Sequence, residues 1–171
     1  PKDFDEPSSW ESIAAELSQH PSVLCVVNKR DDCRTLHALL PAGTIHLSAL
    51  MCGAHRSRVI QSIKHRLGAG ESVRVVSTQL VEAGVDVDFP VVYRAMAGLD
   101  AIAQAAGRCN REGRSTEQGV VRIFVPPSQS PRGILRTAEG IAWKMLKSDV
   151  HDDLRPQDFE MFFRGGSCKT R

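Results

Sequence analysis

Short apolar runs alternate along the chain with segments in which apolar residues recur every three or four positions. The first run, residues 23–27, is continuously apolar, which is typical of a parallel strand buried on both faces. Four more strands are predicted where apolar and β-branched residues cluster. They span residues 44–47, 73–76, 90–93 and 119–125.

Helical periodicity predicts helices at residues 8–19, 31–40, 54–67, 100–109 and 133–147. Their starts are set by polar residues that can cap a helix. These are Ser8 with Glu11, Asp31 or Asp32, and Asp100. Gly68 stands where the C-terminal cap of the third helix is expected. A last helical turn is predicted at residues 159–163.

Strands that alternate with helices predict an α/β fold, a parallel sheet with helices on both faces. A chain of 171 residues is long enough for one hydrophobic core. The Pro- and Ser-rich stretch at residues 126–131 is the best candidate hinge. We therefore predict a core domain over residues 1–127 and a C-terminal helical extension, or the start of a linker to a further domain, over residues 128–171.

Polar residues follow two of the predicted strands directly. Residues 28–30 (Asn-Lys-Arg) come after the first strand, and residues 77–79 (Ser-Thr-Gln) come after the third. In parallel sheets, ligands bind beyond the carboxyl ends of the strands. We therefore expect functional contacts at this edge of the sheet.

Composition limits the classes of partner. Aromatic residues make up 5% of the chain, so a binder of nucleic acid would act through phosphate contacts rather than base stacking. The net charge of +2 does not by itself indicate a nucleic-acid binder. The densest basic cluster comprises Arg56, Arg58, Lys64, His65 and Arg66. A solvated helix face is the commoner explanation of such a cluster.

The five cysteines show no paired spacing, and the odd count argues against a disulfide framework. We therefore expect a reducing, cytoplasmic setting and a core position for Cys25. Cys52 and His55 form a lone C-x-x-H pair, too little for a metal site, so no metal ligands are predicted. No membrane segment or signal peptide is predicted, and the start at Pro1 leads us to expect a piece of a longer protein.

The segment from Gln104 to Arg111 carries the strongest chemical signal. On a helix, Gln104, Gly107, Arg108 and Arg111 would share one face, which places two arginines one turn apart on a background of small apolar residues. Guanidinium groups suit phosphate oxygens, and an arginine beside a transferring phosphoryl group stabilises its charge. A surface helix whose arginines form salt bridges is the structural alternative.

A second segment, residues 77–88, follows the third strand and combines Ser77, Thr78, Gly84 and Asp86. Thr78 can offer a hydroxyl and an N–H to a nucleic-acid phosphate. Gly84 permits a close backbone approach, and Asp86 can accept from a ribose hydroxyl or orient an arginine. Taken alone, ordinary turn chemistry would also explain these residues.

Together the two segments resemble motifs V and VI of superfamily-two helicases. The longer string over residues 75–113 is similar to one branch, the CRISPR-associated helicase–nuclease recruited by type I surveillance complexes. Residues 26–28 resemble motif IV, and residues 46–48 with residues 55–56 resemble the next nucleic-acid-facing segment. The resemblance spans residues 23–127 and implies a RecA-like second helicase lobe.

The resemblance implies a role for each matching residue. Arg111 corresponds to the arginine finger, Arg108 also reaches the γ-phosphate, and Gln104 organises that contact. The positions that face the nucleotide's ribose are Gly84 and Asp86. The positions that face the nucleic-acid backbone are Thr78, Asn28 and Arg56, with Ser77 beside Thr78.

The resemblance also implies which parts lie elsewhere. The chain has neither a phosphate-binding G-x-x-x-x-G-K-[ST] loop nor an acidic magnesium segment, so ATP with magnesium would be bound mainly by an absent first lobe. A nuclease metal, if any, would sit in an absent HD nuclease domain, since the lone His151-Asp152 dipeptide lacks further ligands. Lys29 departs from the threonine common at that place in the family.

We therefore predict the second motor lobe of an ATP-dependent DNA helicase, inactive as an ATPase by itself. Its expected partners are single-stranded DNA, the first RecA-like lobe, the HD nuclease domain and the surveillance complex, with no membrane partner. Two alternatives remain open. The lobe could belong to another superfamily-two translocase of restriction or repair, or it could be a degenerate RecA-like module that binds nucleic acid or protein.

Overall fold

The computed structural model describes residues 6–48, 50–79, 86–109, 119–128 and 134–148. Its strands are β1 (Val23–Val27), β2 (Ile45–Leu47), β3 (Arg74–Thr78), β4 (Val91–Ala95) and β5 (Val120–Phe124). They form one parallel sheet in the order β2-β3-β1-β4-β5. This order places β1 at the centre of the sheet, and the predicted parallel sheet is confirmed.

The central strand β1 shows why its sequence is an unbroken apolar run. All five residues are buried. Val23, Cys25 and Val27 belong to the core cluster on one face of the sheet, whereas Leu24 and Val26 belong to the cluster on the other face. Because successive side chains of a strand point to opposite faces, a strand covered on both sides needs apolar residues at every position.

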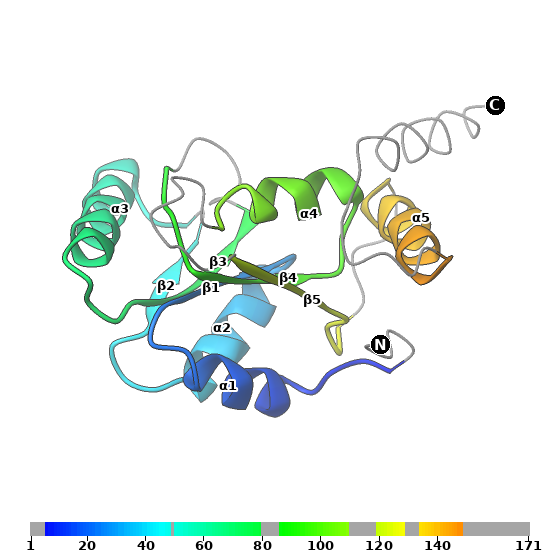
Figure 1. The fold of residues 1–171 in the computed structure, drawn as a ribbon, viewed down its shortest axis with the longest axis horizontal. Helices are drawn as coiled ribbons and strands as arrows, with labels where there is room; N and C mark the ends of the chain where they lie inside the picture. Colours follow the sequence, from blue (N-terminus) through cyan, green and yellow to red (C-terminus); the bar gives the residue numbers. More distant parts are fainter. Residues whose placement is uncertain (1–5, 49, 80–85, 110–118, 129–133, 149–171) are drawn as a thin grey trace.

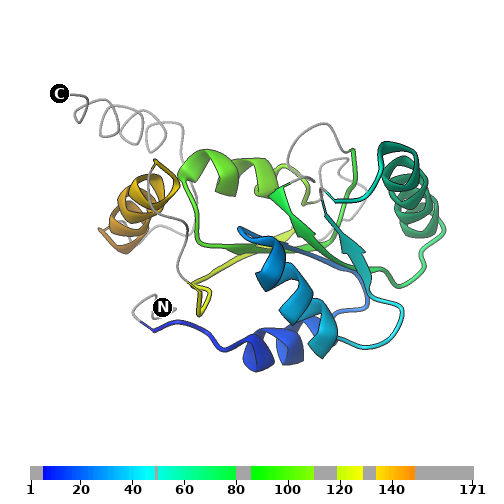
Figure 2. The same cartoon turned by 180° about the vertical axis from the view of Figure 1, so that it is seen from behind.

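Helices cover both faces of the sheet, as predicted (Figures 1 and 2). One face carries α1 (Trp10–Ser18) and α2 (Arg30–Leu39), whose buried residues Ile13, Leu17 and Leu36 join its core. On the other face, α3 (Gly53–Gly68) and α4 (Leu99–Ala106) contribute buried residues to the second core cluster. The fifth helix, α5 (Ile134–Ser148), lies beside α4 (Figure 1).

None of the predicted capping residues stands at the N-cap of its helix. Ser9, not Ser8, caps α1, and its hydroxyl accepts from the backbone N–H of Ser12. Ser8 instead donates its backbone N–H to Val125 beyond β5. The N-cap of α2 is Lys29, without a side-chain cap bond, and the two predicted aspartates lie in the first turn. There their negative charge still complements the helix dipole.

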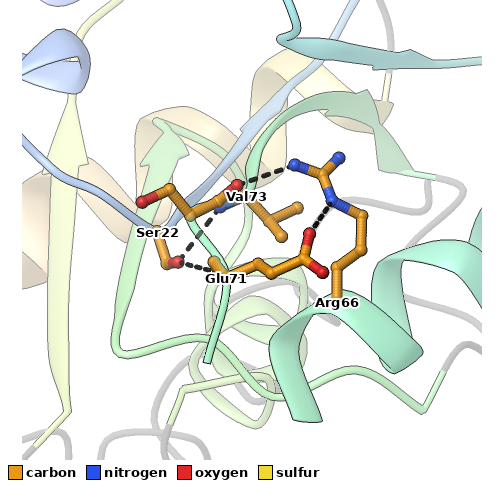
Figure 3. A network of polar contacts seen from close by, with 5 residues as sticks. Ser22, Arg66, Glu71 and Val73 are labelled. Atoms are coloured by element: carbon orange, nitrogen blue, oxygen red, sulfur yellow. Dashed lines mark hydrogen bonds and ion pairs between the residues drawn. The ribbon is translucent and has the colours of Figure 1, made fainter. Parts of the chain in front are cut away.

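The end of α3 also differs from the prediction, because Gly68 is its last helical residue rather than its cap. The left-handed conformation falls two residues later, at Gly70 with φ +74°. Arg66 then holds the following turn, donating to the Glu71 carboxylate at 3.0 Å and to the Ser72 carbonyl at 2.8 Å. This network fixes where β3 begins (Figure 3).

Ser22, just before β1, completes the same network. Its hydroxyl donates to the Glu71 carbonyl at 3.3 Å and accepts from the Val73 N–H at 3.2 Å (Figure 3). One side chain therefore aligns the amino ends of β1 and β3. Because strand register is set at such ends, this contact supports the pairing of Val23 with Arg74.

The observed limits of β3, β4 and α4 also differ from the predicted ones. β3 extends to Thr78, so Ser77 and Thr78 close the strand instead of following it. β4 begins at Val91 and runs to Ala95, and Gly98 rather than Asp100 stands at the N-cap of α4. The helical turn predicted at residues 159–163 lies outside the described residues.

The described part of the C-terminal extension packs against the core. Ala142 of α5 is fully buried in a third cluster with Met96, Leu99 and Ile102. Ser128, after β5, donates its hydroxyl to the buried carboxylate of Asp32 at 2.6 Å. The predicted boundary at residue 127 stays a prediction.

Candidate functional site

The parallel strands bring their carboxyl ends to one edge of the sheet. Asn28 follows β1, Ser48 follows β2, Thr78 ends β3 and Met96 follows β4. Three of the residues predicted to face nucleic acid, Asn28, Ser77 and Thr78, therefore share this edge. We call it the carboxyl edge.

Asn28 is held by hydrogen bonds within the chain. Its side-chain nitrogen donates to the Met96 carbonyl at 2.7 Å, and its side-chain oxygen accepts from the Arg94 guanidinium at 2.7 Å. Arg94 Nη1 also donates to the Ala95 carbonyl at 2.8 Å. The exits of β1 and β4 are thus joined through two side chains, and the predicted contact of Asn28 with nucleic acid stays a prediction.

Arg94 is a residue that the sequence analysis missed. It lies in β4, and among the described residues it is the largest side chain that is fully buried. A signal was available, since an arginine interrupts the apolar run Val91-Val92-Tyr93-Arg94-Ala95 at a strand covered on both faces. Charged residues are almost never fully buried without partners, so such an interruption indicates an internal network.

Ser77 and Thr78 occupy the end of β3 with limited access. Ser77 is fully buried and its hydroxyl donates to the Thr78 carbonyl at 2.8 Å. Thr78 retains 9% exposure. Of the two, only Thr78 presents surface at the carboxyl edge.

Arg56 lies in the first turn of α3, which also begins at the carboxyl edge. Its backbone N–H bonds the Cys52 carbonyl and its side chain is half-buried. The rest of the predicted basic cluster is spread along α3. Lys64 pairs with Asp86 and Arg66 with Glu71, so the cluster is not a single patch.

The described residues among those predicted to contact the nucleotide, Asp86, Gln104 and Arg108, lie elsewhere. Helix α4 begins after the carboxyl end of β4 and runs back across the sheet, and the backbone N–H of Phe89, two residues before β4, donates to the Arg108 carbonyl at 2.9 Å. Asp86 stands three residues before Phe89 and pairs with Lys64 at 3.3 Å. The segments of Asp86 and Arg108 are therefore neighbours on a second surface, which we call the α4 face.

The predicted helical face is only partly present. α4 ends at Ala106, three residues before the predicted Cys109, so Gln104 lies on the helix while Arg108 lies beyond it. The chain leaves the helix because Cys109 forms a parallel bridge with Phe89. Arg111 and Gly84 lie outside the described residues.

Gly107 follows α4 with φ −65°, a conformation open to any residue. A Cβ there would make ordinary contacts of 3.5 Å with the Ala103 and Gln104 carbonyls. The described residues around Gly107 therefore leave room for a larger side chain. A close approach, as the sequence analysis expected, would have to come from a group outside them.

The buried thiols are poor nucleophiles. Burial raises the pKa of Cys25 far above its ordinary range and that of Cys33 to about 12, and Cys25 has the core position predicted for it. Burial raises the pKa of Cys109 to about 11, and its thiol lies 3.4 Å from the Val120 carbonyl. Cys109 therefore acts as a weak donor beneath the Arg108 segment.

Metal and membrane features can be stated for the described residues only. Within them, no three His, Cys, Asp or Glu side chains are grouped as a metal site would require. His151 and Asp152 fall outside that part of the chain. None of the described helices combines the length and apolar character that crossing a membrane would need.

A polar cluster connects α1 with the sheet. The Tyr93 hydroxyl donates to Glu16 at 3.0 Å and lies 3.3 Å from His20 Nε2, while Arg122 pairs with Glu16 at 3.4 Å. Burial and the nearby Arg122 lower the pKa of His20, and Glu16 offsets this only in part. Burial and the bond to Glu16 raise the pKa of Tyr93 to about 12.

This cluster predicts a loss of stability in mild acid. The unfolded chain protonates His20 near its ordinary pKa of 6.5, whereas the folded state resists protonation until lower pH. The free energy of unfolding should therefore decrease as the pH falls below about 6.5. We expect thermal unfolding from about pH 7.5 to about pH 5 to show a flatter profile for His20→Gln than for the wild type. Parallel profiles would contradict this.

Comparison with known proteins places the chain in a family. Residues 19–114 match the family described as the C-terminal part of the CRISPR-associated nuclease/helicase Cas3. The CRISPR-associated nuclease/helicase Cas3 of Haloferax volcanii is 40% identical over 101 residues, which cover 55% of this chain and 11% of that protein.

Solved structures share the fold at lower identity. T. fusca Cas3 with ATP has a TM-score of 0.67 at 18% identity, and the match covers 92% of this chain and 21% of that one. A chain in a CRISPR RNA-guided surveillance complex before nicking has a TM-score of 0.61 at 18% identity, over 88% of this chain and 21% of that one. The chain thus has the RecA-like fold of a helicase C-terminal lobe and spans a small part of each relative.

Proposed function

Because the chain belongs to the family of Cas3 C-terminal domains, we propose that it is the second motor lobe of an ATP-dependent DNA helicase with an associated nuclease. Its tasks there are to complete the ATP site of a first RecA-like lobe and to track single-stranded DNA. By itself the chain is not expected to hydrolyse ATP, since it has no phosphate-binding loop.

The observation that carries the proposal is the bond from the Phe89 N–H to the Arg108 carbonyl. It makes neighbours of two segments that were singled out separately for nucleotide contact. Asp86 stands on one of them, and Arg108 on the other, with Gln104 exposed on the preceding helix. Arg111 and Gly84 belong to the same two segments in sequence, and we assign them the finger and ribose-facing roles with magnesium-bound ATP as ligand.

The carboxyl edge is the proposed track for DNA. Thr78 and Arg56 reach this edge from β3 and α3, and Asn28 stands between the exits of β1 and β4. Ser77, being fully buried, supports Thr78 from inside rather than meeting the strand. The separation of this edge from the α4 face fits a motor in which DNA and ATP occupy different surfaces of one lobe.

A surveillance complex is the proposed recruiter of the whole protein, and degradation of invading DNA its proposed outcome. A fold neighbour described within a CRISPR RNA-guided surveillance complex supports this kind of partner. The nuclease domain and its metal would lie in the part of the protein that this chain does not span, since the Haloferax volcanii relative is covered over 11% of its length.

Arg56 tests the DNA track. In the full-length protein, Arg56→Ala should weaken single-stranded DNA binding roughly five- to tenfold, because one charge-assisted phosphate contact is lost. It should also reduce the slope of log affinity against log salt concentration by about one. Fluorescence anisotropy across a salt series measures both.

The matched control is Arg136→Ala. Arg136 is exposed on α5, and α3 and α5 lie at opposite ends of the molecule (Figures 1 and 2). This change removes the same charge and should leave the affinity and its salt slope at the wild-type values. If DNA affinity did not change from low to high salt, or if both variants behaved alike, the proposal that DNA binds along the carboxyl edge would be wrong.

A further inference from the structure

The buried arginine of β4 stands close to the proposed DNA track. Arg94 has 0% exposure, and its Nη1 lies 2.7 Å from Asn28 Oδ1, 2.8 Å from the Ala95 carbonyl and 3.5 Å from the Val26 carbonyl. These contacts link β4 to Val26, near the end of β1, and to Asn28, which follows that strand. The Arg94 side chain thus fixes the backbone where the central strand β1 ends.

Asn28 extends this link to α4. Its side-chain nitrogen donates to the Met96 carbonyl at 2.7 Å, and Met96 is followed within two residues by Gly98, the N-cap of α4. The chain from Arg94 through Asn28 to Met96 therefore ties together the bend at residues 28 and 29 and the start of α4. Lys29, the second residue of that bend, is half-buried at the N-cap of α2.

Stability alone does not explain an arginine at this position. A buried charge loses its hydration, and replacing buried charged groups by apolar side chains of similar volume is often neutral or stabilising. What an arginine adds is direction, because the planar guanidinium holds its N–H groups at fixed angles. Here Nη1 bonds acceptors on β1, on β4 and on Asn28.

We propose that Arg94 is a positioning residue for DNA binding, which orients Asn28 and thereby fixes the bend at residues 28 and 29 for contact with the phosphates of single-stranded DNA. The inference rests on the proposed function. In this arrangement Asn28 shapes the bend, and Lys29 supplies a charge that a phosphate can meet. Arg94 itself stays inside the protein.

The test is DNA-stimulated ATP turnover of the full-length protein as a function of single-stranded DNA concentration. Arg94→Met keeps the length but removes every donor, and we expect it to raise the half-saturating DNA concentration roughly tenfold. Turnover at saturating DNA should stay close to wild type, because the Phe89–Arg108 bond that supports the proposed ATP contacts does not involve Arg94 or Asn28. Arg94→Lys, which keeps a charged donor, should recover part of the loss.

A double-mutant cycle separates positioning from general weakening. Asn28→Ala should raise the half-saturating DNA concentration as Arg94→Met does. The double variant should be no worse than either single variant, because both substitutions break the same Arg94–Asn28 hydrogen bond. Arg74→Met is the matched control. Arg74 is a half-buried arginine of β3 that bonds the Ser18 carbonyl at 3.1 Å, away from the carboxyl edge, and its loss should leave DNA binding unchanged.

The outcomes are distinct. A wild-type protein without DNA-stimulated turnover would overturn the proposed function itself. Normal stimulation with an unchanged half-saturating concentration in Arg94→Met, or additive effects in the cycle, would overturn only the role of Arg94. If Arg94→Met fails to fold by thermal unfolding, Arg94→Lys, Asn28→Ala and their double variant carry the same cycle.

Discussion

Replacing Arg111 with alanine in the full-length protein is expected to lower DNA-stimulated ATP turnover by about 10³-fold or more, the range found for arginine fingers. The guanidinium would stabilise negative charge that spreads over the transferring phosphoryl group, so its loss acts on the transition state. DNA affinity should be retained, because Arg111 is assigned to the ATP site and not to the proposed DNA track. A coupled ATPase assay and DNA anisotropy on the same preparation measure both quantities.

Arg114→Ala is the control for this prediction, since it removes an equal charge three residues further along the chain. It should leave turnover within a few-fold of wild type. Unchanged turnover in Arg111→Ala would mean that the arginines after α4 are structural. The degenerate-module alternative, in which the lobe only binds a partner or DNA, would then be preferred.

Phe89→Ala is expected to lower the free energy of unfolding by about 3–5 kcal/mol, the usual loss for a large aromatic side chain in a close-packed core. Phe89 is 1% exposed and packs in the cluster beneath α3 and α4. For a chain of this length the loss corresponds to a decrease in melting temperature of roughly 6–20 °C. Because Phe89 also pairs with the Arg108 segment, unfolding should begin near the α4 face.

Two variants calibrate this measurement. Phe89→Leu keeps most of the apolar volume and should cost less than about 1.5 kcal/mol. Leu39→Ala removes a side chain that is 44% exposed and should change stability by no more than about 0.5 kcal/mol. A loss below about 1 kcal/mol in Phe89→Ala would show that the packing under the α4 face is loose.

The alternative of another superfamily-two translocase makes a different prediction for the whole protein. The lobe would complete the ATP site of the whole protein with the same arginines, but no surveillance complex would recruit that protein. Pull-down of the full-length protein with an assembled CRISPR surveillance complex distinguishes the two, independently of the chemistry within the lobe.

Local patterns in the sequence were sufficient for the fold class. The apolar run at residues 23–27 became the central strand with the predicted bounds, and the alternation of elements became a parallel sheet covered on both faces. These features depend on which residues must avoid water, and that requirement is written along the chain itself. The assignment of motifs V and VI likewise depends on short contiguous strings.

The tertiary structure alone decided how those strings are arranged. The residues joined by the Arg94–Asn28 bond are 66 positions apart, so no local pattern indicates it. The helix before Arg108 ends early because its next residues pair with Phe89, twenty positions before Cys109. Thus the sequence alone indicated candidate residues for phosphate and DNA contacts, whereas packing between distant segments separated the carboxyl edge from the α4 face, because backbone pairing and burial overrule local helical preference.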